Sequence, residues 1–240
     1  MKKIIKTRKN YENFLVGEII NLCVPNERAI KKNCWAEWFN DIKNLSATQH
    51  GIFPNNKAKQ FSILNSLAND KSKILLMVCD KSSKDAFGVI SLQNIDFQQK
   101  SAEVAINMSK TSNQTISPFA TLEAMALIVE HAFETVGLKR IYGGQAYPQL
   151  ASWNKMMEII GFKSEGIARK SFVRGQNIQD KVFFACHYSF YLKLKASRGS
   201  LWGSLKIIKS AMVKQPKKSF AEKLDKKIIK EEKNHFNFLF

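Results

Sequence analysis

A long apolar helix between two strand-forming segments restricts the fold of this chain more than any other feature. Ser117-Pro118 supplies a helix cap followed by proline at the first helical position, and Gly137 ends the segment. Between them apolar side chains recur at helical spacing, at Phe119, Leu122, Met125, Val129 and Phe133. Strand-forming runs lie on both sides, at Ser101–Met108 and Lys139–Ala146. A strand, a helix and a strand in this order predict a βαβ unit with two parallel strands.

Ahead of this unit the sequence predicts one strand, two helices and a meander. Phe14–Val24 is typical of a strand. Asn26 is a helix cap, and the helix after it has an apolar face at Ile30, Cys34 and Trp38. A second helix is expected at Ala58–Leu67. Short polar turns then join three strand-forming runs into an antiparallel meander, Ile74–Asp80, Phe87–Ile95 and Ser101–Met108.

Behind the unit the sequence predicts a helix and a hairpin. The helix covers Ala151–Ile160 and ends at Gly161, and the hairpin pairs Ile167–Val173 with Lys181–Tyr191. The predicted order is β-α-α-β-β-β-α-β-α-β-β. We therefore expect an α/β (α+β) fold with a mixed, mostly antiparallel central sheet flanked by helices.

Positive charge is concentrated at the end of the chain. The 240 residues include 38 Lys and Arg and 20 Asp and Glu, a formal net charge of +18. Between Lys193 and Phe240 there are 13 Lys and Arg against 4 acids, so half of the excess lies in the last fifth. This charge favours anionic partners, but no nucleic-acid reading motif accompanies it, and we do not expect nucleic acid as the partner. We expect residues 1–192 to form one domain and residues 193–240 a basic, partly helical tail.

The tail contains an amphipathic pattern with two interpretations. Apolar side chains repeat at helical spacing, at Leu201, Leu205, Ile208 and Met212, with Trp202 beside them. Pro216 ends the pattern, and we expect a second short helix after it. In one interpretation the stripe lies on a membrane interface or on an acidic partner. In the other it packs back onto the domain, or onto a second copy in a homodimer, because isolated helices this short are marginal in water.

Neither the cysteines nor the N-terminus indicates secretion or a metal site. The four cysteines form no C-x-x-C pair and have no His at ligand spacing, at Cys23, Cys34, Cys79 and Cys186. We expect buried, reduced thiols and no metal. The basic N-terminus has no apolar stretch behind it, and no apolar run approaches the length of about 18 residues that spans a membrane. These features predict a cytoplasmic protein.

The start of the long helix is a candidate anion site. We expect the backbone amides of Phe119, Ala120 and Thr121 to lack partners within the helix, and the helix dipole would then favour a pyrophosphate there. The alternative is an ordinary helix start capped by solvent.

A longer pattern surrounds the segment Tyr147–Phe162. The segment and the residues after it supply part of the pattern N-x-A-S-x-x-x-x-E-K-L-G-F-x-x-E-G-x-x-R, which is followed by a hairpin and an Asp. The matching residues are Gln149, Ala151, Ser152, Glu158, Gly161, Phe162, Glu165, Gly166, Arg169 and Asp180. The pattern resembles the ribosomal-protein-alanine N-acetyltransferase branch of the GNAT acetyltransferase superfamily. With the order of elements, and with Ala102–Met108 similar to the family's fourth strand, the resemblance spans Leu15–Tyr191.

The sequence departs from the family at three positions. The family's pyrophosphate loop, [QR]-x-x-G-x-[GA], corresponds best to Gln114–Phe119, which contains no glycine. The tyrosine that serves many members as general acid is Met157 here, a feature shared by the branch named above. The asparagine that opens the N-x-A-S motif is Gln149.

The resemblance implies an acetyl-CoA-dependent N-acetyltransferase that acts on the primary amine of a protein N-terminus, an amino sugar or another small molecule. Ser152 corresponds to the family's general-acid serine, and Trp35 and Trp38 lie on a helix that walls the acceptor site in the family. Asp180 is a further candidate acceptor contact, and core packing is the alternative for at least one tryptophan. Acetyl-CoA is expected to contact a set formed by Asn107, Met108, Gln114, Ser117, Phe119, Ala120, Thr121, Gln149 and Ser152.

Amine acetylation also needs a base, because an ammonium cannot attack a thioester. Glu103 lies at the position of the fourth-strand glutamate and is the candidate; the alternative is a solvated acid on a half-exposed strand. Asp180 is a second candidate base, with a structural ion pair to a nearby Arg or Lys as its alternative.

A different class of function stays open. A non-catalytic module of the same fold could bind nucleic acid or an anionic membrane or protein surface, and the glycine-free loop and the net charge of +18 favour it. The segment around Ser152, together with Glu103, favours the enzyme. The fold does not determine the acceptor.

Overall fold

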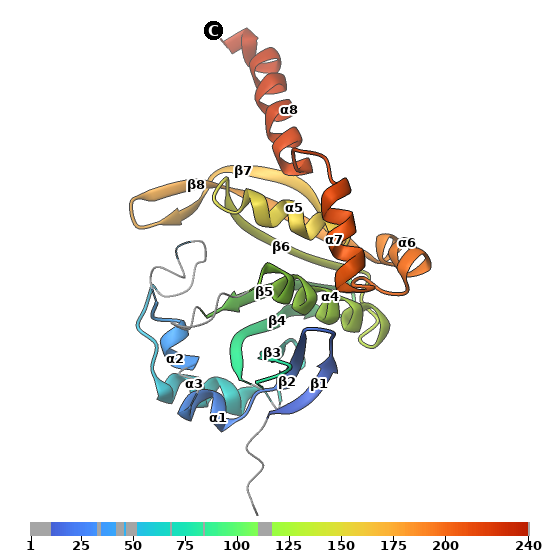
Figure 1. Ribbon diagram of the computed structural model, residues 1–240. Coiled ribbons are helices and arrows are strands. Elements are labelled where there is room, and N and C mark those ends of the chain that lie inside the picture. Colours follow the sequence, from blue (N-terminus) through green and yellow to red (C-terminus); the bar gives the residue numbers. More distant parts are fainter. Residues whose placement is uncertain are drawn as a thin grey trace, which may run out of the picture.

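An eight-stranded sheet forms the body of the molecule (Figure 1). The computed structural model describes residues 11–32, 35–41, 46, 52–67, 69–83, 85–109 and 117–239. The strand order across the sheet is β1-β2-β3-β4-β5-β6-β8-β7. The strands are β1 (Glu12–Val16), β2 (Ile20–Val24), β3 (Ile74–Asp80), β4 (Ala86–Asp96), β5 (Ser101–Met108), β6 (Arg140–Tyr147), β7 (Lys163–Arg174) and β8 (Asn177–His187).

The predicted mixed sheet is confirmed. Among the described strands, β5 and β6 pair in parallel and every other neighbouring pair is antiparallel. Helix α4 (Pro118–Glu134) connects β5 to β6 and completes the predicted βαβ unit. Its start is capped by the Ser117 side chain, and Gly137 beyond its end has a φ of +82°, which favours glycine.

Helices cover the sheet in two apolar clusters. The short helices α1 (Glu27–Lys31), α2 (Trp35–Trp38) and α3 (Lys57–Ser66) contribute to one cluster with β2, β3 and β4. The larger cluster lies against α4 and includes side chains of α5 (Ala151–Ile159). No helix in the described part of the chain has the length and apolar character needed to cross a membrane.

The prediction of a single strand over Phe14–Val24 is wrong. The segment is the hairpin of β1 and β2, and the Gly17 amide donates to the Ile20 carbonyl at 2.9 Å. The buried carboxylate of Glu123 on α4 accepts the amide N–H groups of the turn, including that of Ile19 at 2.8 Å. A side chain at position 17 would collide with this carboxylate, since an added Cβ would lie 2.7 Å from Glu123 Oε1.

The second strand of the last hairpin begins and ends four residues earlier than predicted. β8 ends at His187, and Tyr188–Arg198 form helix α6 rather than extending the strand to Tyr191. In the helix, Tyr188 and Tyr191 lie one turn apart and both pack on Phe133 of α4, with ring centroids at 5.7 and 5.4 Å. Tertiary packing thus overrides the strand preference of aromatic residues.

The tail packs on the domain through its first part. Helix α7 (Leu205–Lys214) begins later than the stripe, so Leu201 and Trp202 lie in the preceding turn, where both are buried in the main core together with Ile208. The Glu18 carboxylate in the β1–β2 turn accepts the Trp202 Nε1–H at 2.8 Å and the Leu205 amide at 2.7 Å.

Helix α8 (Phe220–His235) starts against the domain and then projects away from it, followed by a short 3-10 turn (Phe236–Leu239) (Figure 1). Residues 231–237 are exposed. These contacts agree with the interpretation that the apolar stripe packs back onto the domain. The division into residues 1–192 and 193–240 stays a prediction.

Candidate active site

β5 and β6 separate after a short stretch of pairing. Their parallel register joins only Ser101–Glu103 to Arg140–Tyr142. β6 instead pairs with β8 along its whole length. Because a helical crossover connects the two strands, their far ends can diverge without breaking the chain, and a gap opens in the sheet beyond Glu103.

The edge of β5 that borders this gap carries backbone groups free of the β4 ladder. The Ser109 amide donates to the Phe87 carbonyl at 2.7 Å, which fixes the alternation of this antiparallel pair. Ile106 and Met108 therefore direct their N–H and C=O groups away from β4, toward the gap. Such an edge can bind an extended chain that contains amide groups.

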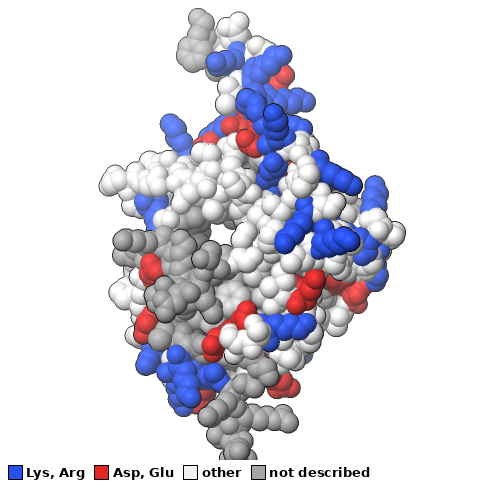
Figure 2. All heavy atoms as spheres, in the orientation of Figure 1, with Lys and Arg blue, Asp and Glu red and all other residues white. Residues whose placement is uncertain are grey.

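A cavity of about 330 Å³ occupies the gap. Val104 and Met125 line it from the α4 side, and Glu103 and Ala105, which alternate with Val104 along β5, line it from the opposite face. The cavity therefore crosses the sheet. Figure 2 shows an opening through the molecule between the regions that β5 and β6 occupy in Figure 1.

Glu103 lies at the border of this cavity, as the sequence predicted for a base. Its carboxylate is half-buried and accepts one hydrogen bond, from Asn94 Nδ2 at 3.2 Å. Within the described residues it forms no ion pair. The carboxylate keeps free lone pairs and can accept a proton from a neighbouring amine.

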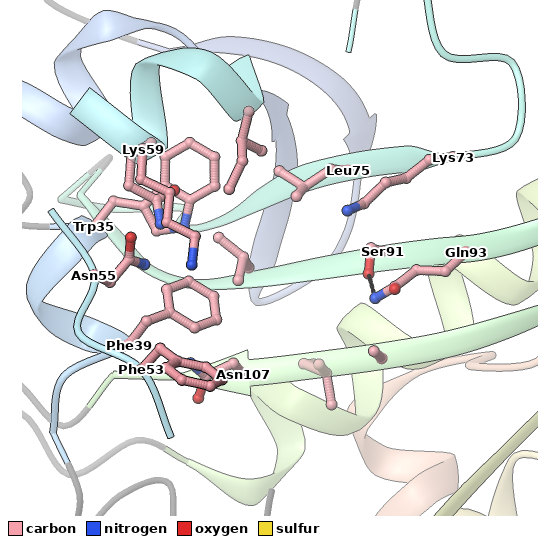
Figure 3. Close-up of a pocket in the computed structure, with 15 residues that line it drawn as sticks. Trp35, Phe39, Phe53, Asn55, Lys59, Lys73, Leu75, Ser91, Gln93 and Asn107 are labelled. Carbon is pink, nitrogen blue, oxygen red and sulfur yellow. Dashed lines mark hydrogen bonds between the residues drawn. The ribbon is translucent and has the colours of Figure 1, made fainter. Parts of the chain in front are cut away.

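A second cavity, of about 180 Å³, lies between β3–β5 and α2–α3 (Figure 3). Gln93, Ala105 and Ile106 line both cavities, so the two meet at β5. Trp35 and Trp38 are both buried in the apolar cluster of these helices, and of the two only Trp35 also lines the second cavity. The structure thus places both tryptophans in the core and one of them at a cavity wall.

Asp180 lies in an ion-pair network on the other side of the gap. It binds Arg169 at 2.8 Å, and Arg169 also binds Asp225 of α8 at 2.7 Å. Burial alone would raise the pKa of Asp180, but the hydrogen bond from the Lys170 amide and the Arg169 guanidinium together lower it below its ordinary value. These contacts favour the structural ion pair over a role as base.

The amides at the start of α4 are partly used within the chain. Ser117 Oγ accepts the Phe119 amide at 3.3 Å, and the Ser117 carbonyl accepts the Ala120 amide at 2.9 Å. The expectation that both amides lack partners is wrong, because the cap residue satisfies them. Thr121 follows them in the first turn of the helix, and Gln114 lies outside the described residues.

The remaining predicted residues are not among those that line the larger cavity. Met108 ends β5, and Asn107, whose side chain points to the opposite face from Met108, lines the second cavity. Gln149 is exposed and bonded to Gln179 Nε2 at 3.1 Å. Ser152 is exposed on the first turn of α5, next to Trp153, which lines the larger cavity.

Sequence reasoning missed several polar cavity residues. Gln93 and Lys73 line the second cavity, and Gln145 lines the larger one and donates to Asn154 Oδ1. The available signal was polar residues within strand segments that are otherwise apolar, such as Gln93 in β4 and Gln145 in β6. A buried amide in such a segment needs a partner, from the protein or from a ligand.

No family model and no curated protein matches the sequence. Solved structures with a similar fold include a GCN5-related N-acetyltransferase from Brucella melitensis, at a TM-score of 0.61 and 22% identity, covering 91% of this chain and 95% of that one. RimJ from Mycobacterium smegmatis, in complex with CoA-disulfide, has a TM-score of 0.61 and 15% identity over 74% of this chain and 88% of that one. Spermidine N-acetyltransferase from Vibrio cholerae, in complex with CoA and spermine, has a TM-score of 0.60 and 18% identity, covering 73% and 99%.

Residues 1–192 make up four fifths of the chain, whereas the Brucella match covers 91% of it. This match therefore extends into the C-terminal tail. The match with the Vibrio enzyme is confined to a shorter part. At these identities the likeness concerns the fold, including the parallel strand pair within an otherwise antiparallel sheet. The chain has the fold of the GNAT acetyltransferases.

Proposed function

We propose that this chain is an acetyl-CoA-dependent N-acetyltransferase that transfers the acetyl group to a primary amine. The observation that carries the proposal is the gap between β5 and β6, where a cavity of about 330 Å³ crosses the sheet and Glu103 lies at its border. Two of the similar structures contain CoA or a CoA disulfide, which supports CoA chemistry for this fold.

The residues around the gap fit the pantetheine arm of acetyl-CoA. Such an arm alternates methylene and amide groups. Met125, Trp153 and Phe184 supply apolar walls, while Gln145 and the free backbone edge of β5 at Ile106 supply hydrogen-bonding groups. This mixture of many apolar walls and few polar groups is typical of cofactor pockets.

Acetyl-CoA supplies an activated acetyl thioester. In this proposal Glu103, directly or through a water molecule, removes a proton from the acceptor ammonium. The amine nitrogen then attacks the carbonyl carbon, so that the C–N bond forms and the C–S bond breaks. Ser152 gives a proton to the departing sulfur and takes one from the nitrogen, which leaves a neutral amide and a thiol. A backbone N–H on the free edge of β5, at Ile106 or Met108, stabilises the developing oxyanion.

The start of α4 is proposed to hold the pyrophosphate. Because Ser117 already satisfies two of the first amides, the Thr121 amide and the preceding loop with Gln114 carry more of this role than the helix start alone. The proposed acetyl-CoA contacts at Met108 and Gln149 lie at the end of β5 and just before α5.

Isothermal titration with acetyl-CoA and with CoA tests the proposal. We expect binding by the wild type and weaker binding by Gly144→Leu, whose added side chain would fill the gap, since Gly144 lines the larger cavity. Gly166→Leu is the matched control, because an added Cβ at Gly166 meets no atom within 4 Å. If the wild type does not bind acetyl-CoA or CoA at millimolar ligand concentration, the proposal of an enzyme is wrong. The alternative of a non-catalytic module that binds an anionic partner would then stand.

Ser152→Ala is expected to lower the rate of acetyl transfer by about 10²-fold while the affinity for acetyl-CoA stays the same. Steady-state kinetics and titration on the same preparation measure the two quantities. An unchanged rate would show that water, rather than Ser152, gives the proton to the departing sulfur. The cytoplasmic location, a homodimer and contact of the tail with a membrane or acidic partner stay predictions.

A further inference from the structure

The second cavity contains buried polar atoms without a partner. Trp35 and Gln60 are each 1% exposed, and Trp35 Nε1 and Gln60 Oε1 form no hydrogen bond within the described residues. Asn107 Nδ2 is buried and unpartnered as well. All three residues line this cavity. Since buried polar groups in folded proteins nearly always have a partner, these atoms point to a ligand.

The charge of the cavity indicates the sign of that ligand. Lys59 and Lys73 line it, and its described lining residues include no Asp or Glu. Two hydrogen bonds from Ser72 lower the pKa of Asp70, and the charge of Lys73 lowers it further. Within the described residues, however, Lys73 forms no ion pair with Asp70. A cationic polyamine would meet two lysines here, whereas an anionic group would be attracted.

The donors gather at one end of the cavity. In Figure 3, Trp35, Lys59 and Asn107 lie at one end, and Lys73 and Gln93 lie at the other. The indole N–H and the ammonium can only donate hydrogen bonds, so this end matches an acceptor-rich group such as phosphate or carboxylate.

The proposed base lies at the opposite end. Glu103 pairs with Gln93 across β4 and β5, four residues before Asn107 on the same face of β5. At about 3.3 Å per residue, the base and the donor end are about 13 Å apart along the strand.

We infer that the acceptor is a primary amine whose molecule also carries a phosphate or carboxylate group, bound at Trp35, Lys59 and Asn107 about 1 nm from the amine. The inference rests on the proposed function and names the substrate class for the same site. The amine reaches Glu103 past Gln93, where the two cavities meet, and the aromatic rings of Phe39 and Phe53 lie at the donor end (Figure 3).

The test compares acceptors that differ only in the anionic group. One arm uses a tripeptide with a free C-terminal carboxylate and the same peptide as its amide. The other uses 6-aminohexyl phosphate and 6-aminohexanol, and spermidine is the cationic comparison. We expect kcat/KM to be at least about tenfold higher for the anionic member of one pair, which also identifies phosphate or carboxylate as the group recognised.

Variants locate the group. Trp35→Phe and Lys59→Gln are each expected to reduce this preference by about tenfold or more, because each removes a hydrogen bond to a charged group. Trp38→Phe on the same helix and Lys57→Gln on α3 are the matched controls and should retain the preference. Binding of the anionic acceptor, measured by titration in the presence of CoA, should follow the same order.

Two outcomes separate the failures. If acetyl-CoA binds and spermidine or the neutral amines are acetylated as well as the anionic ones, the inference is wrong and the proposed function stands. If acetyl-CoA does not bind, the proposed function is wrong and the inference falls with it. A preference that survives in Trp35→Phe and in Lys59→Gln would also overturn the inference, because the anion would then bind elsewhere.

Discussion

The carboxylates on the two sides of the β5–β6 gap differ in how many partners they have within the described chain. On the β8 side, Arg169 binds Asp180 and Asp225 at 2.8 and 2.7 Å, and Tyr147 Oη donates to Asp225 at 3.4 Å. On the β5 side, Trp35 Nε1 has no partner within the described residues, and the Glu103 carboxylate accepts a single hydrogen bond.

The difference separates a carboxylate that is paired within the fold from one that is available to a ligand. Asp180 and Glu103 are both acids on strands next to the gap, and the sequence made both candidates for the base. One is held by cationic and amide donors, which connect the hairpin to α8, while the other faces a cavity with free lone pairs. Polar groups whose partners lie within the chain stabilise the fold, and those without partners are available to a ligand.

Removing the tail from Ser200 onward should give the largest effect. The deletion exposes the surface covered by Leu201, Trp202 and Ile208, each worth about 1.5–3 kcal/mol of burial, against a typical total stability of about 5–15 kcal/mol. We expect loss of soluble, cooperatively folding protein, measured by expression and thermal denaturation. The control is a chain that ends at Lys230. It lacks residues 231–240, of which residues 231–237 are exposed.

If the chain without residues 200–240 instead melts at the same temperature as the full chain, the tail does not contribute to the stability of the domain. In that case the predicted boundary near residue 192 separates two independent units. The same deletion therefore tests the predicted division of the chain.

Glu103→Gln should reduce acetyl transfer by about 10²- to 10⁴-fold while leaving the melting temperature and the affinity for acetyl-CoA unchanged. The reason is that Glu103 has no ion-pair partner whose loss would destabilise the fold. Steady-state kinetics over a range of pH measures the effect, and Glu12→Gln on the exposed β1 strand is the control. A normal rate in Glu103→Gln would show that a water chain or another carboxylate removes the proton.

Asp225→Asn should have the opposite profile, a loss of stability without a loss of chemistry. Arg169 keeps Asp180 but loses its second carboxylate, and because the three side chains are 21–32% exposed we expect a cost of only about 1 kcal/mol. Thermal denaturation measures it, with Glu231→Gln on the exposed part of α8 as the control. A large loss of activity at unchanged stability would place this network in the active site and remove the contrast.

The smallest expected effect is that of Glu18→Gln on the pH dependence of the melting temperature. The hydrogen bonds from the Trp202 indole and the Leu205 amide lower the pKa of Glu18. A lowered pKa in the folded chain stabilises it above the unfolded value of about 4.5, and this stabilisation is lost as the pH falls through the folded value. The difference in melting temperature between wild type and variant should therefore be present at pH 7 and shrink below pH 4. A difference independent of pH would mean that Glu18 acts only through neutral contacts.

Local signals were enough for the elements around the gap. Ser117-Pro118 and Gly137 fix both ends of α4, and the β3 and β5 boundaries follow from their apolar runs and polar turns. The family resemblance made Glu103 a candidate, and the observed alternation along β5 directs its side chain away from α4. Side chains of adjacent residues in a strand point to opposite faces, so the buried neighbours Ala102 and Val104 determine its direction.

What the sequence by itself determined was therefore the βαβ unit, the meander and the GNAT-like order of elements, because caps, turns and periodicity act over a few residues. Only the tertiary structure decided three other features. Phe14–Val24 bends into a hairpin whose turn binds Glu123, and the tail packs against the domain with Trp202 bonded to Glu18. Trp35 lines a cavity, whereas Trp38 does not. Each of these depends on contacts between residues far apart in the chain. Whether a polar side chain finds a partner within the protein or stays available to a ligand is decided at that level, since neighbours in space, rather than in sequence, provide the partner.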